Sequence, residues 1–337
     1  MKVTVCMVSY NTADHLPGAI ASLLSQDHAD LHIVVVDNNS HDSSAAVARE
    51  FGDVEVIENR RNVGYAGAAN QALSRATDGG FFLVTPDVRL TSDHISRCVS
   101  ALAADPRIAS VQGRLTRMAA DGAPIRRDGH GVIDSTGHTA HTNRVFRNRG
   151  DDQADDGSFD QPAEIFGVCG AAALHRIQAL HDVAVEGEVF DQNLFAFFED
   201  VDLDWRLKAR DWQAWYVPQA RAMHERGGEG PRRSAIVERL SYRNWFLTVI
   251  KNDDPSTWWP HAHLLGATTV LRTADLAVTV PTALVKALTD VRLLPSTLRK
   301  RRLADTRRLV GGAQIVDRWF ESFDYAAWIR KRLKRGW

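Results

Sequence analysis

The chain has 337 residues, of which 44% are hydrophobic and 25% are charged, and its formal net charge is −1 at pH 7. These values fit a soluble globular protein with one large domain, or with one domain and an appendage. The three cysteines are far apart and form no C-x-x-C pair, which argues against a disulfide framework or a zinc site. Because the N-terminus has no signal-peptide pattern either, we expect a cytoplasmic protein.

The charge is unevenly distributed along the chain. From Lys286 to the C-terminus there are 14 Lys and Arg against 5 Asp and Glu, a local charge near +9. Such asymmetry predicts a basic appendage that faces an anionic partner. The most apolar late stretch, residues 264–285, is interrupted by Arg272 and Asp275. Because a spanning helix needs about 20 mostly apolar residues, surface association with a membrane is favoured over insertion.

Strand and helix patterns alternate through the first quarter of the chain. Short β-rich runs predict strands at residues 2–9, 31–36, 54–58 and 79–84. Apolar residues at helical spacing predict intervening helices at residues 16–24, 43–51 and, opened by a glycine-rich segment, up to residue 76. This alternation is typical of a parallel sheet with crossover helices, in which ligands bind beyond the carboxyl ends of the strands.

Polar residues follow the first two predicted strands. Ser9, Tyr10 and Asn11 end the first strand, and Asp37 and Asn39 follow the second. Amide and hydroxyl groups at such a position can bind sugar or phosphate oxygens, and a carboxylate can accept hydrogen bonds from a base or a ribose. A turn residue that caps the following helix is an equally good interpretation of Asp37.

A glycine-rich segment opens the third predicted helix and contains Asn62, Gly64, Tyr65, Gly67 and Asn70. Glycines let the backbone approach a ligand closely, and a helix N-terminus favours phosphate. The two glycines are three residues apart, and no strand immediately precedes them. They therefore do not form the G-x-G-x-x-G fingerprint, and alone they do not identify a nucleotide site.

Two residues are candidates for a divalent metal site. Asp87 follows the strand at residues 79–84, where a carboxylate suits a cation that bridges phosphates, although a plain Pro–Asp turn is the alternative. His224 follows a strand predicted at residues 213–217 and lies in a predicted loop, residues 222–228, that could carry it toward a metal or phosphate. A lone histidine is more often structural.

The middle of the chain is less regular. After a helix predicted at residues 92–104 and a strand at residues 108–115, residues 119–161 have few apolar runs and predict a long functional or mobile loop. The histidines of this loop lack a compelling ligand spacing and predict no metal site; they are His130, His138 and His141. Residues 165–174 are apolar and small and predict a close-packed strand or bend.

The most acidic stretch of the chain contains Glu199, Asp200, Asp202 and Asp204. The apolar residues between them have helical spacing, so we expect a helix that begins near Glu199, with its acidic first turn stabilised by the helix dipole. One interpretation is an amphipathic helix in which Asp204 pairs with Lys208. The other is that one of these carboxylates is a catalytic base.

Taken in order, these motifs resemble those of family 2 glycosyltransferases with the GT-A fold, especially bacterial rhamnosyltransferase-like members. The matching segments are residues 8–11 (VSYN), 36–40 (VDNNS), 61–67 (RNVGYAG) with Asn70, 85–87 (TPD), and 198–203 (FEDVDL) with Trp205. The similarity covers residues 2–252. It implies a Rossmann-like α/β catalytic domain at residues 1–252, with a mixed, mainly parallel sheet flanked by helices. The last helix of this domain is expected at residues 234–250, and residues 253–337 are expected to form a basic, amphipathic helical appendage.

The resemblance also implies a reaction. The enzyme would be an inverting transferase that moves a sugar from a nucleotide donor to a hydroxyl group. Asp200 would be the general base, with Glu199 as its rival, while Asp202 and Trp205 would contact the acceptor. The chemistry suits these residue types, because a base removes the hydroxyl proton as the oxygen attacks the anomeric carbon in one displacement.

The implied donor site spans the first third of the chain. Its residues are Ser9, Tyr10, Asn11, Asp37, Asn39, Asn62, Gly64, Tyr65, Gly67, Asn70 and Asp87. Among them, Asp37 would contact the base, and Asp87 would join His224 at a Mn²⁺ or Mg²⁺ ion on the donor diphosphate. The sequence departs from the family's D-x-D metal motif, because Thr85 stands where the first Asp is expected.

Several partners follow from the resemblance and the basic tail. The donor would be a dTDP- or UDP-sugar, with dTDP-rhamnose as one candidate, and the acceptor a saccharide or a lipid-linked saccharide. Basic clusters at residues 298–302 and 328–335 predict contact with an anionic membrane at the inner face of a bacterial plasma membrane. A solvated helix face or an oligomer contact, such as a homodimer, is the alternative. Nucleic acid is not expected, because no binding motif accompanies the charge.

Two other functions compete with glycosyl transfer. A non-catalytic nucleotide-sugar or glycan-binding protein could keep the same fold, although the carboxylates at Asp87 and Asp200 argue against it. A nucleotidyltransferase on a similar sheet is disfavoured, because no phosphate-binding glycine-rich loop follows the first strand.

Overall fold

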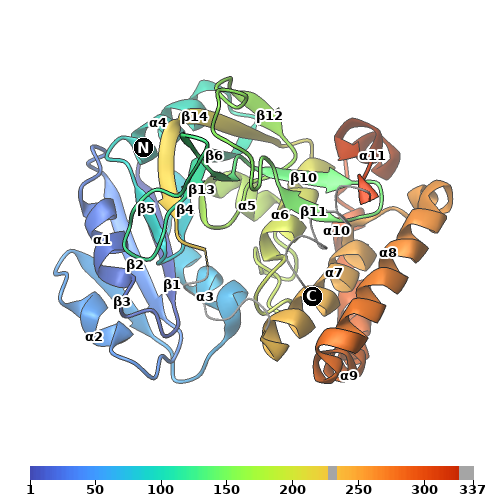
Figure 1. The fold of residues 1–337 in the computed structure, drawn as a ribbon. Coiled ribbons are helices and arrows are strands. Elements are labelled where there is room, and N and C mark those ends of the chain that lie inside the picture. The colour runs from blue at the N-terminus through green and yellow to red at the C-terminus, as the bar shows by residue number, and fades with distance from the viewer. Residues whose placement is uncertain (227–233, 326–337) are drawn as a thin grey trace.

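A mixed ten-stranded sheet between helices organises the structure, a computed structural model that describes residues 1–226 and 234–325 (Figure 1). Its strands follow the order β3-β2-β1-β4-β13-β6-β14-β12, with β5 attached to β14 and β9 to β6. Four neighbours pair in parallel: β1 (Val3–Ser9), β2 (Leu31–Asp37), β3 (Val54–Glu58) and β4 (Gly80–Val84). The remaining strands of the sheet are β5 (Val88–Leu90), β6 (Ile108–Arg117), β9 (Ile133–Ser135), β12 (Ala163–Ile165), β13 (Ala172–Arg176) and β14 (Gln213–His224).

The sheet has a separate hydrophobic core on each face, because successive side chains of a strand point to opposite sides. On one face, Val5, Met7 and Phe82 pack with residues of α1 (Leu16–Leu24), α2 (Ser44–Arg49) and α4 (His94–Ala104). On the other face, Cys6 and Phe81 pack with residues of α3 (Gly64–Leu73), α5 (Ile177–Asp182) and α6 (Glu199–Ala209). The predicted α/β class with a mixed sheet is therefore confirmed.

Residues 119–161 are not the structureless loop that the sequence predicts. They form β9 and four further short strands: β7 (Arg126–Arg127), β8 (His130–Gly131), β10 (His138–His141) and β11 (Phe146–Asn148). The partner of β10 explains the miss, because β10 pairs with β11 and also with β15 (Phe320–Glu321), near the other end of the chain. A local pattern does not reveal such a distant pairing.

The predicted strand at residues 213–217 is also longer than expected. Pairing with β6 continues to His224, so residues 222–224 lie in β14 and not in a loop. The rest of that predicted loop includes Gly227 and Gly228, which lie outside the described residues. For residues 165–174 the sequence predicts a strand or a bend, and the structure contains both, because a bend joins β12 to β13.

The C-terminal half adds a group of helices beside the sheet (Figure 1). They are α7 (Ala235–Asn252), α8 (Trp258–Thr279), α9 (Pro281–Thr289), α10 (Leu294–Asp305) and α11 (Gly312–Trp319), with short 3-10 helices at Pro255–Thr257 and Asp290–Leu293. Within the described ranges, no helix combines the length and apolar character needed to cross a bilayer.

Buried contacts join this helical region to the preceding chain. The Arg144 guanidinium, fully buried beside β11, donates to the Asp253 carboxylate at 2.7 Å, and the Trp245 indole donates to the Arg144 carbonyl at 2.6 Å. Trp205 of α6 packs against Phe320 of β15. The division after residue 252 stays a prediction, and packing is continuous across it.

Two of the four basic residues in the cluster at residues 298–302 are used inside the protein. Lys300 is buried and pairs with Glu188 at 2.8 Å and Asp191 at 2.6 Å. Arg301 donates to the carbonyls of Ile250 at 2.5 Å and Asp253 at 2.7 Å. These contacts fix α10 to the rest of the protein, while Arg299 and Arg302 are exposed, so the membrane contact of this cluster stays a prediction. The second cluster, residues 328–335, lies outside the described residues.

Replacing Lys300 with Met is expected to lower the free energy of unfolding by about 3 kcal/mol at pH 7, because one partner of a buried ion pair is removed. Burial opposes the charge of Asp191, but Lys251 and Lys300 hold its pKa well below the usual value. A lowered carboxyl pKa gives stability that is complete above the unfolded pKa of about 4 and is lost as the pH falls below it.

Urea unfolding measures both effects for Lys300→Met. The difference from the unsubstituted protein should shrink between pH 5 and pH 3, over the window in which the unfolded carboxyl group becomes protonated. Lys286→Met is the control, because Lys286 is exposed on α9. Equal effects of the two substitutions would contradict the assigned role of the buried pair.

Candidate active site

Three predicted site segments meet at one edge of the sheet. Ser9 and Asp37 are register partners at the carboxyl ends of β1 and β2, and Val84 at the end of β4 pairs with Met7 of β1. Asp87 follows β4 by three residues. Because these strands are adjacent and parallel, their polar ends form the common ligand edge that the sequence predicts.

Asp37 has the features of a ligand-binding carboxylate. It is only 4% exposed, and its Oδ2 accepts a hydrogen bond from the Ser40 backbone N–H at 3.0 Å. Its Oδ1 is buried and has no partner among the described residues. An unused buried acceptor is costly unless a ligand supplies a donor, such as the N–H group of a nucleotide base. The hydrogen bond from Ser40 to Oδ2 also shows Asp37 acting as a turn residue.

The two residues after β1 border this position. The Asn11 side chain accepts from the His41 backbone N–H at 2.7 Å, and Asn11 itself has a left-handed backbone with φ of 55°. Asn39 also has positive φ, 66°. Tyr10 is 43% exposed and lies edge-on to the His41 ring. These two turns therefore border the edge of the sheet at which β1 and β2 end.

Asn38, which the sequence did not single out, fixes the glycine-rich segment to the end of β2. Its amide nitrogen donates to Asn62 Oδ1 at 2.9 Å, and its oxygen accepts from the Val63 backbone N–H at 2.9 Å. Gly64 then adopts a φ of +80°, and a Cβ there would lie 2.4 Å from the Phe195 carbonyl oxygen. Only glycine fits this position without strain.

Two residues predicted to bind the donor instead support the fold. Ser9 is fully buried, and its hydroxyl bonds the Thr12 hydroxyl at 2.8 Å. The Asn70 amide bonds both the N–H and the carbonyl of Phe190, at 3.0 and 2.7 Å. Gly67 packs against the Val63 side chain. The polar groups of Ser9 and Asn70 form hydrogen bonds within the chain, so we do not expect these two residues to bind the donor.

Asp87 and His224 are brought together as predicted. His224 Nε2 lies 3.3 Å from Asp87 Oδ2, and its Nδ1 lies 2.8 Å from Asp134 Oδ2. Burial disfavours the charged ring, but the hydrogen bonds with Asp134 and Asp87 outweigh it and raise the pKa of His224 to about 10. Burial likewise opposes ionisation of Asp87, while His224 holds the pKa of that carboxyl well below its usual range.

The chemistry of this pair fits a divalent cation. Asp87 Oδ1 is buried and lacks a partner among the described residues, so one carboxylate oxygen is available as a ligand. A carboxylate and an imidazole are both accepted by Mn²⁺, and Asp134 would orient the ring as an outer partner. Asp134, from β9, was missed because it lies in the segment predicted as a loop. Binding a cation would displace the proton from His224.

The bend between β12 and β13, residues 167–171, connects the separate motifs. The Tyr65 hydroxyl donates to the Gly170 carbonyl at 3.4 Å, and the Thr85 backbone N–H donates to the Ala171 carbonyl at 3.0 Å. The Gly170 N–H in turn donates to Asp200 Oδ2 at 3.1 Å. This bend therefore contacts the glycine-rich helix α3, the segment that leads from β4 to Asp87, and the acidic helix α6.

Asp200 is the most accessible of the four carboxylates of α6. Its side chain is 22% exposed, whereas Glu199, Asp202 and Asp204 are all buried. Asp200 Oδ1 also accepts from the Val201 N–H at 2.8 Å, so the carboxylate is held at the first turn of the helix. A general base must reach a substrate proton, and this position meets that requirement better than the others.

The structure corrects the predicted acceptor contacts. Asp202 is completely buried and bonds Arg206, Lys251 and Asn252. Trp205 is 1% exposed and packs in an aromatic cluster with Phe320. Both residues belong to the core and cannot contact a substrate.

The expected Asp204–Lys208 pair does not form either. Asp204 bonds His138 of β10 at 2.8 Å and the Val168 N–H at 3.1 Å. Lys208 instead lies 3.4 Å from the Glu164 carboxylate. The helical spacing is correct, but partners from β10 and β12 are better placed than the neighbour on the same helix.

A segment with unfavourable backbone angles precedes α6 and is held by a residue of α7. Phe195, Phe197 and Phe198 have φ values of 65°, 69° and 71°, which are unfavourable for aromatic residues. The buried Asn244 amide donates to the carbonyls of Leu194, Ala196 and Phe197 at 2.7 to 2.8 Å. Asn244 therefore holds the segment that positions the start of α6.

Replacing Asn244 with Ala is expected to destabilise the protein by about 3 kcal/mol, because three carbonyls lose their shared donor. Activity at low temperature should fall as well, since α6 loses its support. Chemical unfolding and a transfer assay test this, with Ser241→Ala on the same helix as the control. A loss below about 1 kcal/mol would contradict the role of Asn244.

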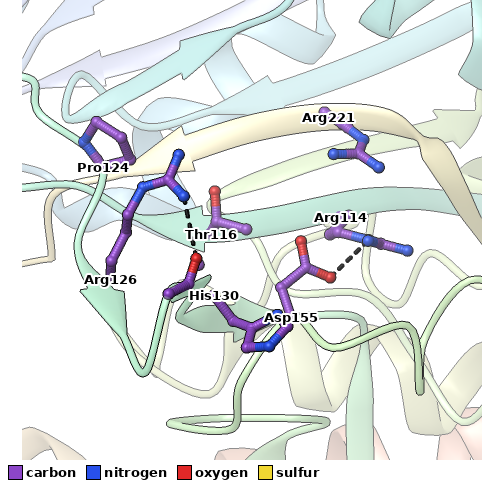
Figure 2. Close-up of a pocket in the computed structure, with 9 residues that line it drawn as sticks. Arg114, Thr116, Pro124, Arg126, His130, Asp155 and Arg221 are labelled. Atoms are coloured by element: carbon purple, nitrogen blue, oxygen red, sulfur yellow. Dashed lines mark hydrogen bonds and ion pairs between the residues drawn. The ribbon is translucent and has the colours of Figure 1, made fainter.

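A separate pocket of about 340 Å³ lies beside the β7–β8 hairpin (Figure 2). Arg126 and Arg221 are exposed at its wall, and the buried Arg114 pairs with Asp155 at 2.5 Å. Arg221 and His224 are three residues apart in β14, so their side chains point to opposite faces of the sheet. This basic pocket is therefore distinct from the site at Asp87 and Asp200.

Solved structures share this architecture. GalNAc-T7 in complex with UDP, GalNAc and Mn²⁺ superposes with a TM-score of 0.65 at 13% identity, over 98% of this chain and 58% of that chain. TarS of S. aureus, residues 1–349, gives a TM-score of 0.53 at 15% identity, over 91% and 89% of the two chains. The fold is that of GT-A glycosyltransferases.

The family model described as "Glycosyl transferase family 2" matches residues 4–181, more than half of the chain. The chain therefore belongs to glycosyl transferase family 2, and the predicted enzyme class is confirmed. A curated relative from Mycobacterium tuberculosis, N-acetylglucosaminyl-diphospho-decaprenol L-rhamnosyltransferase, is 26% identical over 76% of this chain and 85% of its own length. A glucosyltransferase of Escherichia coli, WfgD, is 34% identical over 26% of this chain and 35% of its own length.

Proposed function

We propose that this protein is an inverting glycosyltransferase that moves a sugar from a nucleotide donor to a hydroxyl of a lipid-linked or cell-envelope saccharide. The observation that carries the proposal is the position of Asp200. It is the accessible carboxylate of α6, and Gly170 connects it to Tyr65 of the glycine-rich helix. A base in this position faces a donor bound along the edge formed by Asp37 and Asp87.

The reaction needs one displacement. Asp200 accepts the proton of the acceptor hydroxyl while that oxygen forms a bond to the anomeric carbon, and the bond from this carbon to the nucleoside diphosphate breaks. The attack comes from the face opposite the leaving group, so the anomeric configuration inverts. Glu199 remains the alternative base, although it is 8% exposed.

Asp37 would accept a hydrogen bond from the donor's base through its unused Oδ1. Asp87 and His224 would hold a divalent cation, Mn²⁺ or Mg²⁺, which would neutralise negative charge on the departing diphosphate. The Mn²⁺ in the GalNAc-T7 complex and in a mannosyltransferase complex from Pyrobaculum calidifontis supports this part of the proposal.

The donor proposal rests on relatives. The Mycobacterium tuberculosis relative is named as an L-rhamnosyltransferase that acts on a diphospho-decaprenol-linked sugar, so dTDP-rhamnose and a lipid-linked acceptor are the first candidates here. A thermal-shift screen of UDP-, dTDP- and GDP-sugars, each with and without Mn²⁺, tests it. A Mn²⁺-dependent shift with a dTDP-sugar supports the proposal, and a response only to a GDP-sugar would contradict it.

We further propose that α8 and α9 contact the membrane. These helices expose Trp259, Val270, Val278, Val285 and Leu288, each at least 63% accessible. Exposed Lys286 and Arg292 flank this apolar face. Apolar side chains bordered by basic ones suit the surface of an anionic bilayer. A peripheral position at the inner face of the plasma membrane would follow.

Vesicle co-sedimentation tests this contact. The protein should bind phosphatidylglycerol vesicles more tightly than phosphatidylcholine vesicles, and the double substitution Trp259→Ser with Val278→Ser should weaken binding at least tenfold. A second copy of the chain is the rival occupant of this face. If light scattering shows a dimer that the same variant does not form, and the unsubstituted protein does not bind vesicles, this face is a dimer interface and the membrane proposal is wrong.

A further inference from the structure

A buried histidine lies directly behind the proposed base. His138 of β10 is 5% exposed, and its Nε2 lies 3.6 Å from Asp200 Oδ2. Its Nδ1 lies 2.8 Å from Asp204 Oδ2, and the Val168 N–H donates to that same carboxylate. The three side chains form a continuous row, Asp200–His138–Asp204, that runs from the accessible carboxylate into the core.

The neighbouring carboxylates favour the charged form of the ring. Burial alone would keep it neutral, but the charge of Asp200 and the hydrogen bond to Asp204 raise the pKa of His138 well above its usual value. The titratable groups around the ring are Asp200 and Asp204 on α6 and Cys169 in the bend at residues 167–171. Burial raises the pKa of the Asp204 carboxyl to about 6, although its hydrogen bond with His138 opposes that rise.

We propose that His138 is a positioning residue for Asp200: anchored by Asp204, its ring holds the Asp200 carboxylate in one orientation until the acceptor arrives. This inference rests on the proposed function. It also defines what His138 does not do. An imidazolium has no free lone pair, so the acceptor proton stays on Asp200 and is not relayed inward to Asp204.

Two consequences distinguish positioning from a purely structural role. A cation 3.6 Å from a carboxylate favours its ionised form, so loss of the cation should move the acid limb of the kcat/KM profile to higher pH. The donor is bound by other residues, so the KM for the donor should not change. A structural defect would instead lower the amount of active enzyme at every pH.

His138→Gln provides the first test, because glutamine can still bond Asp204 but carries no charge. We expect kcat to fall about 10- to 100-fold and the acid limb of kcat/KM to rise by about one pH unit, with the donor KM unchanged. His141→Gln, at the other end of β10, is the control and should leave the acid limb in place. A lower kcat with an unmoved acid limb would overturn the proposal.

Asp204→Asn is the second variant in case His138→Gln does not fold. It keeps the imidazole but removes its anchor, so kcat should fall by less than in His138→Gln, with the donor KM unchanged. An unchanged kcat in this folded variant would also overturn the proposal.

Nitrogen-15 NMR of the histidine rings separates this inference from the proposed function, because it needs no activity. His138 should remain an imidazolium at pH 7 in the unsubstituted protein and should titrate at lower pH in Asp200→Asn. A neutral His138 ring at pH 7 would overturn the inference. That outcome includes a ring bound to Zn²⁺ together with Cys169 and Asp200, whose ligand atoms lie within 4.8 Å of one another.

Discussion

Replacing Asp200 with Asn is expected to lower kcat for sugar transfer about a thousandfold while nucleotide binding is retained. An amide of the same shape keeps the contact with the Gly170 N–H only in part, but it cannot accept the acceptor proton. General base catalysis contributes about 10²- to 10⁴-fold to a rate, and the acceptor hydroxyl has no other accessible carboxylate on α6. Nucleotide release in the presence of acceptor measures kcat, and a thermal shift with donor confirms that the variant still binds.

Glu199→Gln is the matched comparison for this substitution. Glu199 is adjacent in sequence, also lies in the first turn of α6, and is the rival base. We expect a reduction below tenfold. If Glu199→Gln lost activity while Asp200→Asn kept it, the assignment of the base would pass to Glu199, although the proposed reaction would stand.

Replacing Asp87 with Asn is expected to weaken Mn²⁺-dependent binding of the donor at least a hundredfold. The cation would lose its carboxylate ligand and keep only the neutral imidazole of His224 from this pair. Calorimetric titration of the nucleotide sugar with and without Mn²⁺ measures this change. Activity should fall in parallel, since the diphosphate leaves without charge neutralisation.

Asp93→Asn controls for a general effect of removing a carboxylate. Asp93 pairs with Arg97 on the surface, away from the ligand edge, and the substitution should not alter Mn²⁺-dependent binding. Thermal unfolding of Asp87→Asn without ligand must also be compared, because Asp87 pairs with His224. Unchanged metal dependence in Asp87→Asn would show that the cation, if any, binds elsewhere.

The parts of the candidate site whose positions follow from the sequence are those built from local patterns. Asp37 and Asp87 follow buried strands, and adjacent parallel strands bring such residues to one edge whatever the rest of the chain does. The helix at Glu199 begins where its acidic first turn indicates. His224 and Asp87 were paired through the resemblance, and the structure brings them within 3.3 Å.

The parts that sequence misses depend on distant partners. His138 meets Asp204 across 66 residues, and Asp134 meets His224 across 90 residues, from a segment without a clear strand pattern. Asn244 supports the segment before α6 from a helix about 50 residues later. Local periodicity does not predict such contacts.

Contacts inside the chain explain why some residues of the matching motifs do not face the ligand edge. Asp202, Trp205 and Ser9 are buried, and the Asn70 amide is bonded to Phe190, so these side chains serve the packing of the motifs. In the cluster at residues 298–302, only part of the positive charge is exposed. Lys300 shows the limit of reasoning from charge alone, since a buried carboxylate partner cannot be seen from composition.

The configuration of the product tests the central claim most directly. A dTDP- or UDP-sugar of defined anomeric configuration is incubated with the enzyme, Mn²⁺ and a lipid-linked saccharide acceptor, and proton NMR reads the new glycosidic linkage. We predict a product with the opposite anomeric configuration, formed at least a hundredfold more slowly by Asp200→Asn. A product that retains the donor configuration, or binding of the donor without any product, would contradict a one-step displacement assisted by Asp200.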